Sequence, residues 1–144
     1  MASAQQSIDV GVSPDAFYAV ISDYEAYPEF LPLLEDVRVV RREGDVVDAE
    51  FTLHLIKRLR YTLRLDGRPG LGLSWTLLEG DFVANAGGWT LEPLPDGTTR
   101  AHYRLHVEVG IFVPGAIVTR LVGRDLPQTL EAFKARAESI GAPP

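Results

Sequence analysis

Residues 46–55 read VVDAEFTLHL, a stretch in which apolar and polar side chains alternate after the first residue. Successive side chains of a β-strand point to opposite faces, so this period of two predicts a strand with one apolar and one polar face. Asp48, Glu50 and His54 fall on the polar face. The pattern is typical of an antiparallel sheet that is covered on one side and solvated on the other.

The same alternation returns on both sides of this stretch. The further alternating segments are residues 60–65, 71–77, 89–91 and 99–109, with a short first strand around Ile8 and Val10. Pairs or clusters of glycine and aspartate separate the segments, as is typical of hairpin turns. We therefore expect an α+β fold whose main element is an antiparallel sheet of about seven strands.

Two short helical segments are predicted between the first strand and the rest of the sheet. Ser13 followed by Pro14 and Asp15 is a strong helix start, because it combines a cap, a first-turn proline and a first-turn acid. Residues 23–32, DYEAYPEFLP, hold two prolines and can form only a turn or two of helix. Asp23 is the expected cap of this second segment.

The second segment carries three aromatic side chains, Tyr24, Tyr27 and Phe30, whose position bears on the function. If these rings fill the interior, they are ordinary core, which is the commoner role of aromatic side chains. If they cover a hollow, the protein is a container for an apolar small molecule. The residues alone leave both interpretations open.

One long helix is expected to cover the apolar face of the sheet. It starts at Pro114-Gly115, and apolar side chains recur at spacings of three or four along the rest of the chain. Pro127 removes the backbone hydrogen bond to the Gly123 carbonyl, so we expect a kink there. A fresh helix capped by Asp125 with Gln128 is the alternative.

Composition narrows the classes of function. At 144 residues the chain is expected to form one domain, residues 1–144. The formal net charge of −6 argues against nucleic acid as a partner, because phosphate binding needs clustered lysine and arginine. The absence of cysteine excludes disulfides and thiolate chemistry. No stretch reaches the ~20 apolar residues of a membrane span, so we expect a cytoplasmic protein without stable membrane insertion. We also expect no cofactor and no metal.

Three segments carry a resemblance to a known family: Asp23 with residues 27–32, residues 88–93 (GWTLEP) and residues 131–137 (EAFKARA). In order and spacing they resemble the helix-grip fold of the START-related superfamily (SRPBCC), most of all its coenzyme Q-binding and polyketide cyclase/dehydrase-like branch. The resemblance implies a sheet curled around the C-terminal helix, with a cavity between them that the two short helices close. We call residues 23–32 the lid segment, and its second proline is Pro32. Quinone-binding relatives often carry a cysteine just after this proline, where this chain has Leu33 and Leu34.

The resemblance also implies which residues line the cavity and bind a ligand. They are Tyr24, Tyr27 and Phe30 from the lid segment, Phe51, Leu53, Tyr61, Leu63, Trp75, Leu77, Asn85, Trp89, Tyr103 and Leu105 from the sheet, and Val118, Leu121 and Val122 from the helix.

Histidine chemistry is not expected in that cavity. His54, His102 and His106 all fall on the polar face of the sheet, where Asp48 or Glu50 are the expected cross-strand partners. His102 and His106 are four residues apart in one strand, about 13 Å, which is too far to share a metal.

Few other groups inside could act as acids or bases. Arg120 and Arg124 lie off the apolar stripe of the helix and are expected to face water, and no Ser/His/Asp arrangement is apparent. The polar groups expected inside are the hydroxyls of Tyr61 and Tyr103 and the amide of Asn85. General acid–base catalysis usually recruits His, Glu, Asp or Lys, so this inventory favours binding over catalysis.

Three functional hypotheses follow. The leading one is a non-catalytic carrier or chaperone for a hydrophobic small molecule, quinone-like or lipid-like. The second is a polyketide aromatase or cyclase in which Tyr103 polarises a carbonyl. The third is a protein-interaction module of the ribosome-association toxin type. The sequence leaves the ligand and the oligomeric state open.

Overall fold

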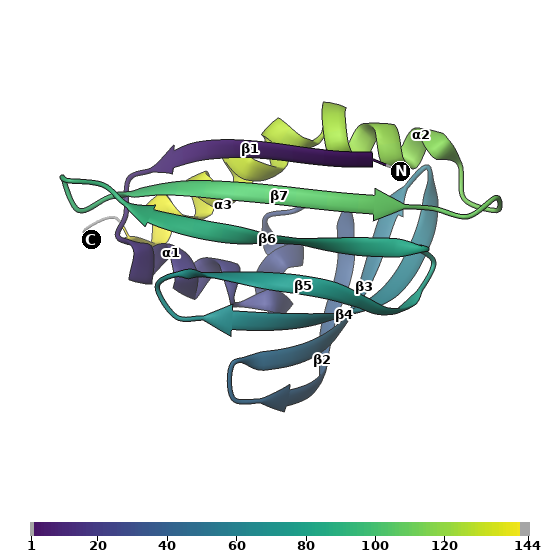
Figure 1. The fold of residues 1–144 in the computed structure, drawn as a ribbon, viewed down its shortest axis with the longest axis horizontal. Helices are drawn as coiled ribbons and strands as arrows, with labels where there is room; N and C mark the ends of the chain where they lie inside the picture. Colours follow the sequence, from purple (N-terminus) through teal and green to yellow (C-terminus); the bar gives the residue numbers. More distant parts are fainter. Residues whose placement is uncertain (1, 142–144) are drawn as a thin grey trace.

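The computed structural model describes residues 2–141 and shows a curved seven-stranded antiparallel sheet with helices against one face (Figure 1). The strands are β1 (Ala2–Val10), β2 (Leu34–Glu43), β3 (Val46–Leu55), β4 (Lys57–Arg68), β5 (Gly72–Gly80), β6 (Ala84–Pro93) and β7 (Thr99–Glu108). The helical segments are α1 (Pro14–Ile21), η1 (Tyr24–Glu29), α2 (Gly115–Thr119), η2 (Arg120–Arg124) and α3 (Leu126–Gly141). The predicted α+β helix-grip fold is confirmed. Along residues 2–141, no helix combines the length and the apolar character that crossing a membrane requires.

The strand order is β1-β7-β6-β5-β4-β3-β2, so every pair except β1–β7 joins neighbours in the sequence. The alternation in β3 places its side chains as predicted, since His54 is exposed while the inner-face residues are buried. Those buried residues are Val47, Ala49, Phe51, Leu53 and Leu55. Asp48 on the outer face is also nearly covered, because it pairs with Arg64 on β4.

β1 is longer than the predicted first strand. It pairs with β7 over nine residues, from Ala2 opposite Val107 to Val10 opposite Thr99. Its first half consists of alanine, serine and glutamine and carries no apolar alternation, so its pairing depends on the exposed edge of β7 and not on a pattern of its own.

Two adjacent glycines in β6 lie where no Cβ atom fits, and the first of them makes room for a large ring on the inner face of the sheet. Gly87 lies opposite Trp75 of β5, and a Cβ atom at residue 87 would lie 2.7 Å from the indole and 2.3 Å from the Arg104 carbonyl oxygen. At Gly88 a Cβ atom would lie 2.5 Å from the Leu73 carbonyl oxygen. Only glycine fits at either position, and this lets the Trp75 ring lie close to the strand.

The short helices begin and end largely as predicted. Ser13 Oγ accepts a hydrogen bond from the Ala16 amide at 3.2 Å, and Pro14 is the first residue of α1. η1 is a 3-10 helix of six residues, as short as its prolines require. The capping role predicted for Asp23 is wrong, because its backbone (φ −91°, ψ 71°) departs from the extended conformation usual at a cap and its side chain makes no capping hydrogen bond.

The C-terminal helical region is divided into segments. η2 is a π-helical turn, in which the Asp125 amide donates to the Arg120 carbonyl at 2.8 Å, and α3 then starts at Leu126. Pro127 is therefore the second residue of a new helix, where its missing N–H breaks no intrahelical bond. The interruption before Leu126 agrees with the alternative of a fresh helix, but the capping role predicted for Asp125 is wrong, because its side chain pairs with Arg120.

Candidate functional site

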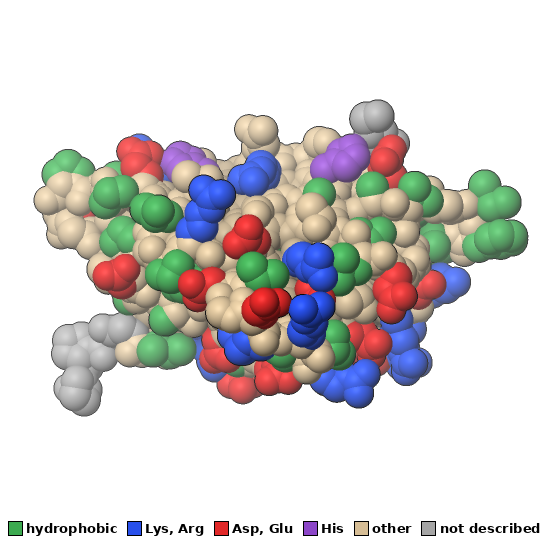
Figure 2. Space-filling view, turned by 60° about the horizontal axis from the view of Figure 1, so that its bottom comes forward, with side chains coloured by type: hydrophobic (Ala, Val, Ile, Leu, Met, Phe, Trp, Pro, Cys, Tyr) green, Lys and Arg blue, Asp and Glu red, His purple; other side chains and the backbone are tan. Residues whose placement is uncertain are grey.

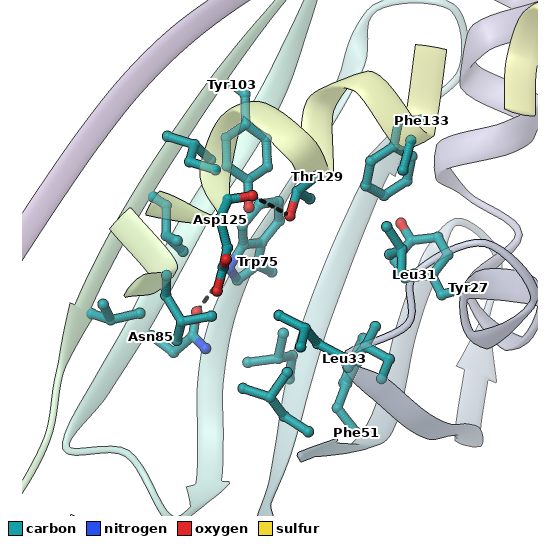
Figure 3. A pocket seen from close by; sticks show the side chains of 18 of the residues that line it. Tyr27, Leu31, Leu33, Phe51, Trp75, Asn85, Tyr103, Asp125, Thr129 and Phe133 are labelled. Atoms are coloured by element: carbon teal, nitrogen blue, oxygen red, sulfur yellow. Dashed lines mark hydrogen bonds between the residues drawn. The ribbon is translucent and has the colours of Figure 1, made fainter. Parts of the chain in front are cut away.

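A cavity of about 480 Å³ lies between the sheet and the C-terminal helical region (Figure 3). One wall of the cavity is the inner face of β3 to β7, and the other is formed by η2 and α3. Residues 31–34, at the end of the lid segment and the start of β2, border the cavity. Most lining side chains are apolar or aromatic. The volume and the character of the wall are typical of sites for small organic ligands.

Most residues predicted for the wall do line this cavity. They are Tyr27, Phe51, Leu53, Tyr61, Leu63, Trp75, Asn85, Trp89, Tyr103, Leu105 and Leu121. The period of two placed the sheet residues on the inner face, and the curvature of the sheet brings them around one space.

The remaining predicted wall residues lie outside the lining. They are Tyr24, Phe30, Leu77, Val118 and Val122. Tyr24 is buried as core beside Tyr27, and Phe30 packs against Phe133 with its other side partly exposed. Val122 belongs to η2, which packs against β1 and β7, and Leu77 lies towards the end of β5, beyond Trp75, and is half-buried.

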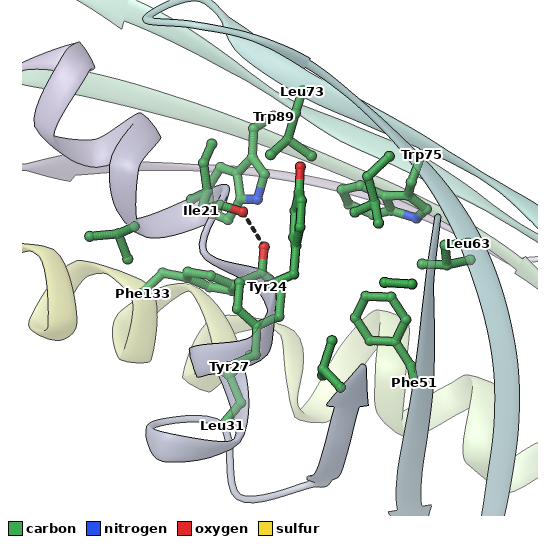
Figure 4. Close-up of a cluster of buried hydrophobic side chains, with 14 of the residues drawn as sticks. Ile21, Tyr24, Tyr27, Leu31, Phe51, Leu63, Leu73, Trp75, Trp89 and Phe133 are labelled. Carbon is green, nitrogen blue, oxygen red and sulfur yellow. Dashed lines mark hydrogen bonds between the residues drawn. The ribbon is translucent and has the colours of Figure 1, made fainter. Parts of the chain in front are cut away.

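The lid segment is both core and cavity wall (Figure 4). The Tyr27 hydroxyl donates to the Ile21 carbonyl, and its ring meets the Phe133 ring edge-on at 5.2 Å between centroids. Phe133 also contacts Trp89 edge-on at 5.3 Å. Such contacts fix η1 against α3 and the sheet, so one face of Tyr27 is held at the cavity.

Burial keeps the tyrosine hydroxyls of the wall neutral. The pKa values of Tyr61 and Tyr103 lie far above the ordinary tyrosine value, chiefly because burial disfavours the charged phenolate. Burial raises the pKa of Tyr27 in the same way. These hydroxyls can donate or accept hydrogen bonds throughout the neutral pH range.

We expect the same burial to make the fold sensitive to alkali. Above about pH 10 the unfolded tyrosines lose their protons while Tyr61 and Tyr103 in the fold keep theirs, so the free energy of unfolding falls as pH rises. Each such tyrosine contributes about 1.4 kcal/mol per pH unit to that fall. Urea unfolding at several pH values should give a shallower fall for Tyr61→Phe than for the wild type. Equal slopes would contradict the burial of this phenol.

Asn85 is the polar group predicted correctly for the inner face. Its amide oxygen accepts a hydrogen bond from the Trp75 indole at 3.1 Å, which fixes the orientation of the amide (Figure 3). The amide nitrogen is not used in this bond, and the residue is 7% exposed at the cavity wall. Asn85 therefore offers hydrogen-bond donors to a ligand.

An ion pair on the helical wall was missed by the sequence analysis. Arg120 and Asp125 both line the cavity, and Arg120 Nε lies 3.2 Å from Asp125 Oδ2. Arg120 was expected to face water, and no acid was expected inside. The π-helical turn explains the difference, because it changes the direction of side chains relative to an ideal α-helix.

The family described as "Polyketide cyclase / dehydrase and lipid transport" matches residues 10–134. The chain belongs to this family. The match spans β1 to α3 and so includes all the walls of the cavity.

Several known proteins are similar to this chain over the whole fold. The ribosome association toxin RatA of Vibrio cholerae is 23% identical over 141 residues, 97% of this chain and 98% of the relative. The Zhui aromatase/cyclase from Streptomyces sp. R1128 superposes with a TM-score of 0.85 at 16% identity, over 98% of this chain and 96% of that one. A START superfamily protein from Mycobacterium smegmatis gives a TM-score of 0.83 at 22% identity, over 96% and 98% of the two chains.

Other lining residues of this family member were not predicted. They are Leu31, Pro32, Leu33, Leu34, Leu65, Val107, Arg120, Asp125, Leu126, Gln128, Thr129, Ala132 and Phe133. Four of them belong to the apolar faces that the sequence pattern predicts, so the pattern could have identified them: Leu65, Val107, Leu126 and Phe133. The polar residues at the start of α3 carried no such signal.

The histidines lie on the outer face as predicted, with other partners than expected. His102 Nδ1 lies 2.6 Å from Ser7 Oγ and its Nε2 lies 2.9 Å from Glu92, so the fold does assemble a Ser/His/Glu cluster. His54 pairs with Glu35, and His106 lies 2.7 Å from Ser3. Strand order, which the sequence does not encode locally, selects these partners. All of these pairs are largely solvent-exposed, unlike the cavity.

Proposed function

We propose that this protein binds a hydrophobic small molecule, quinone-like or lipid-like, in the cavity between the sheet and α3, as a non-catalytic carrier or chaperone. The observation that carries the proposal is the cavity of about 480 Å³ with an apolar and aromatic wall. Binding sites of this kind orient their ligands with a few polar groups. Here Tyr61, Tyr103 and Asn85 are suited to that role.

Tryptophan fluorescence tests this proposal directly. Trp75 and Trp89 are the only tryptophans, and both line the cavity. A short-tailed quinone that enters should quench their emission in a saturable titration. Native mass spectrometry of the purified protein, followed by organic extraction, should identify a retained apolar molecule. An emission spectrum that no apolar ligand changes would contradict the proposal.

A polyketide aromatase or cyclase is the second candidate. It is favoured by the Arg120–Asp125 pair at the cavity wall, since a carboxylate can act as a general base, and by the fold shared with the Zhui aromatase/cyclase. In such an enzyme the Tyr103 hydroxyl would polarise a substrate carbonyl.

Replacing Tyr103 by phenylalanine separates the two candidates, because it removes the hydroxyl and keeps the ring. For a carrier we expect ligand affinity to fall by at most about tenfold, the worth of one hydrogen bond. For a cyclase, turnover of a poly-ketone mimic would fall about 100-fold with little change in binding. Tyr61→Phe is the comparison variant, since Tyr61 is the other phenol that lines the cavity from the sheet, and a cyclase that depends on Tyr103 should lose much less turnover in this variant.

A protein-interaction module is the third candidate. The specific observation in its favour is the end-to-end match to a ribosome association toxin. The face of the molecule seen in Figure 2 carries interspersed acidic and basic side chains. Cosedimentation of the protein with ribosomes measures this activity.

A further inference from the structure

The Arg120–Asp125 pair on the cavity wall is poorly formed. Its two closest approaches are 3.2 Å from Nε to Oδ2 and 3.4 Å from Nη2 to Oδ1, and neither Nε nor Oδ2 has a hydrogen-bond partner among residues 2–141. The Arg64–Asp48 pair on the outer face shows what a well-formed pair in this protein looks like, with two bonds of 2.9 and 3.0 Å.

This imperfect pairing occurs where it is least expected. The Asp125 side chain is only 9% exposed and lines the cavity, and its Oδ2 lies near the Arg120 guanidinium without a hydrogen bond. Buried polar atoms in proteins nearly always have a hydrogen-bond partner, and an exception calls for a cause. A carboxylate accepts several hydrogen bonds, so Asp125 keeps accepting capacity that the protein does not use.

A hydrogen-bond donor faces the same end of the cavity. Asn85 lies opposite Val107 in the β6–β7 pair, and η2, whose last residue Arg124 precedes Asp125, packs against β7. Both side chains line the cavity (Figure 3). The Trp75 indole occupies the Asn85 oxygen and leaves its N–H groups for a ligand. The rest of the wall is mainly apolar.

We propose that Asn85 and Asp125 together hold the hydroxyl group of a neutral, otherwise apolar ligand, an alcohol or a phenol. A hydroxyl is a group that can accept from the Asn85 amide and donate to the Asp125 carboxylate at once. Rotation about χ2, a torsion with a broad energy minimum, turns the Asp125 oxygen that lacks a hydrogen bond towards the ligand hydroxyl. This inference rests on the proposed function of the cavity and defines its ligand class.

A site of this kind distinguishes ligands of similar size and shape by whether they carry a hydroxyl proton. A quinone, a ketone or a methyl ether has no proton to donate to Asp125, so it leaves the carboxylate unsatisfied. A carboxylic acid would bring a second negative charge next to Asp125. A hydroquinone, an enolised or phenolic polyketide and a long-chain alcohol all carry the required hydroxyl.

The test compares 4-octylphenol with 4-octylanisole, which differ in the methyl group that replaces the hydroxyl proton. Titration at neutral pH with tryptophan fluorescence should give an affinity at least about tenfold higher for the phenol. The hydrophobic effect alone would favour the anisole, which has more apolar surface. Equal affinities, or tighter anisole binding, would overturn the hydroxyl inference and leave the proposed function standing. If neither ligand binds, the proposed function itself fails.

Variants assign the preference to Asp125. The double variant Arg120→Leu/Asp125→Leu removes both charges, and we expect it to bind the phenol no better than the anisole. Asp125→Asn keeps the side-chain volume and should lower the preference in the same direction, which guards against a double variant that does not fold. The control is Asp9→Leu/Arg100→Leu, which removes an exposed ion pair of the outer face and should leave the preference unchanged. An unchanged preference in Asp125→Asn and the double variant would refute the role of Asp125.

Discussion

Replacing Phe133 by alanine is expected to destabilise the protein by about 3–5 kcal/mol, the usual cost of removing a fully buried phenylalanine. Phe133 is 4% exposed and meets the rings of Tyr27, Phe30 and Trp89 edge-on, with centroid distances of 5.2, 5.2 and 5.3 Å. The variant therefore loses the contacts that join α3 to the lid segment and to the sheet. Urea denaturation of wild type and variant measures the loss.

Phe30→Ala is the matched control for this prediction. Phe30 shares the contact with Phe133, but it is only half-buried, lies under the Arg136 guanidinium and does not line the cavity. We expect a smaller loss of about 1–2 kcal/mol and nearly unchanged ligand affinity. If Phe30→Ala costs as much as Phe133→Ala, the central position of Phe133 in the aromatic cluster is refuted.

The sheet was predictable because its signal is local. In β3 and β7 the period of two depends only on which side of the strand each residue faces, and it placed Phe51 and Tyr103 correctly. The pattern failed where the backbone leaves the strand. Leu71 was assigned to the apolar face, yet it is 66% exposed, because β5 begins only at Gly72.

The ion pair in the cavity was not predictable from local pattern. An ideal α-helix through residues 114–140 turns Arg120 away from the sheet, and only the π-helical turn before Pro127 brings it to the cavity wall. That turn packs against β1 and β7 and ends at Arg124, three residues before Pro127. The Ser7–His102–Glu92 cluster was missed for a similar reason, since it needs three strands whose order is set by the whole fold.

The two interpretations of the lid aromatics are both partly right. Tyr24 is core, 3% exposed and away from the cavity, whereas Tyr27 is core on one side and cavity wall on the other. Sequence could not divide them, because both are tyrosines in one short 3-10 helix and the path of α3 decides which ring reaches the cavity.

Replacing Ala132 by tryptophan is expected to lower ligand affinity by about 100-fold or more. Ala132 lies on α3 at the cavity wall and is only half-buried, so an indole at this position can extend into the hollow and take the space of the ligand. Because that space exists before the substitution, we expect a change in stability within about 1–3 kcal/mol, and not unfolding. Fluorescence titration with Trp75 and Trp89 as reporters compares the affinity of the variant with that of the wild type.

Ala135→Trp is the control for this prediction, since Ala135 is exposed to solvent one turn further along the same helix, does not line the cavity and receives the same new side chain. We expect it to leave ligand affinity within about twofold of the wild type. The pair also separates a cavity-based function from a surface-based one. If the protein acts on ribosomes through its outer face, Ala132→Trp should cosediment with them as well as the wild type does, although its cavity is filled. Ligand affinity that survives in Ala132→Trp but not in Ala135→Trp would mean that the ligand binds outside the cavity, and the proposed function would be wrong.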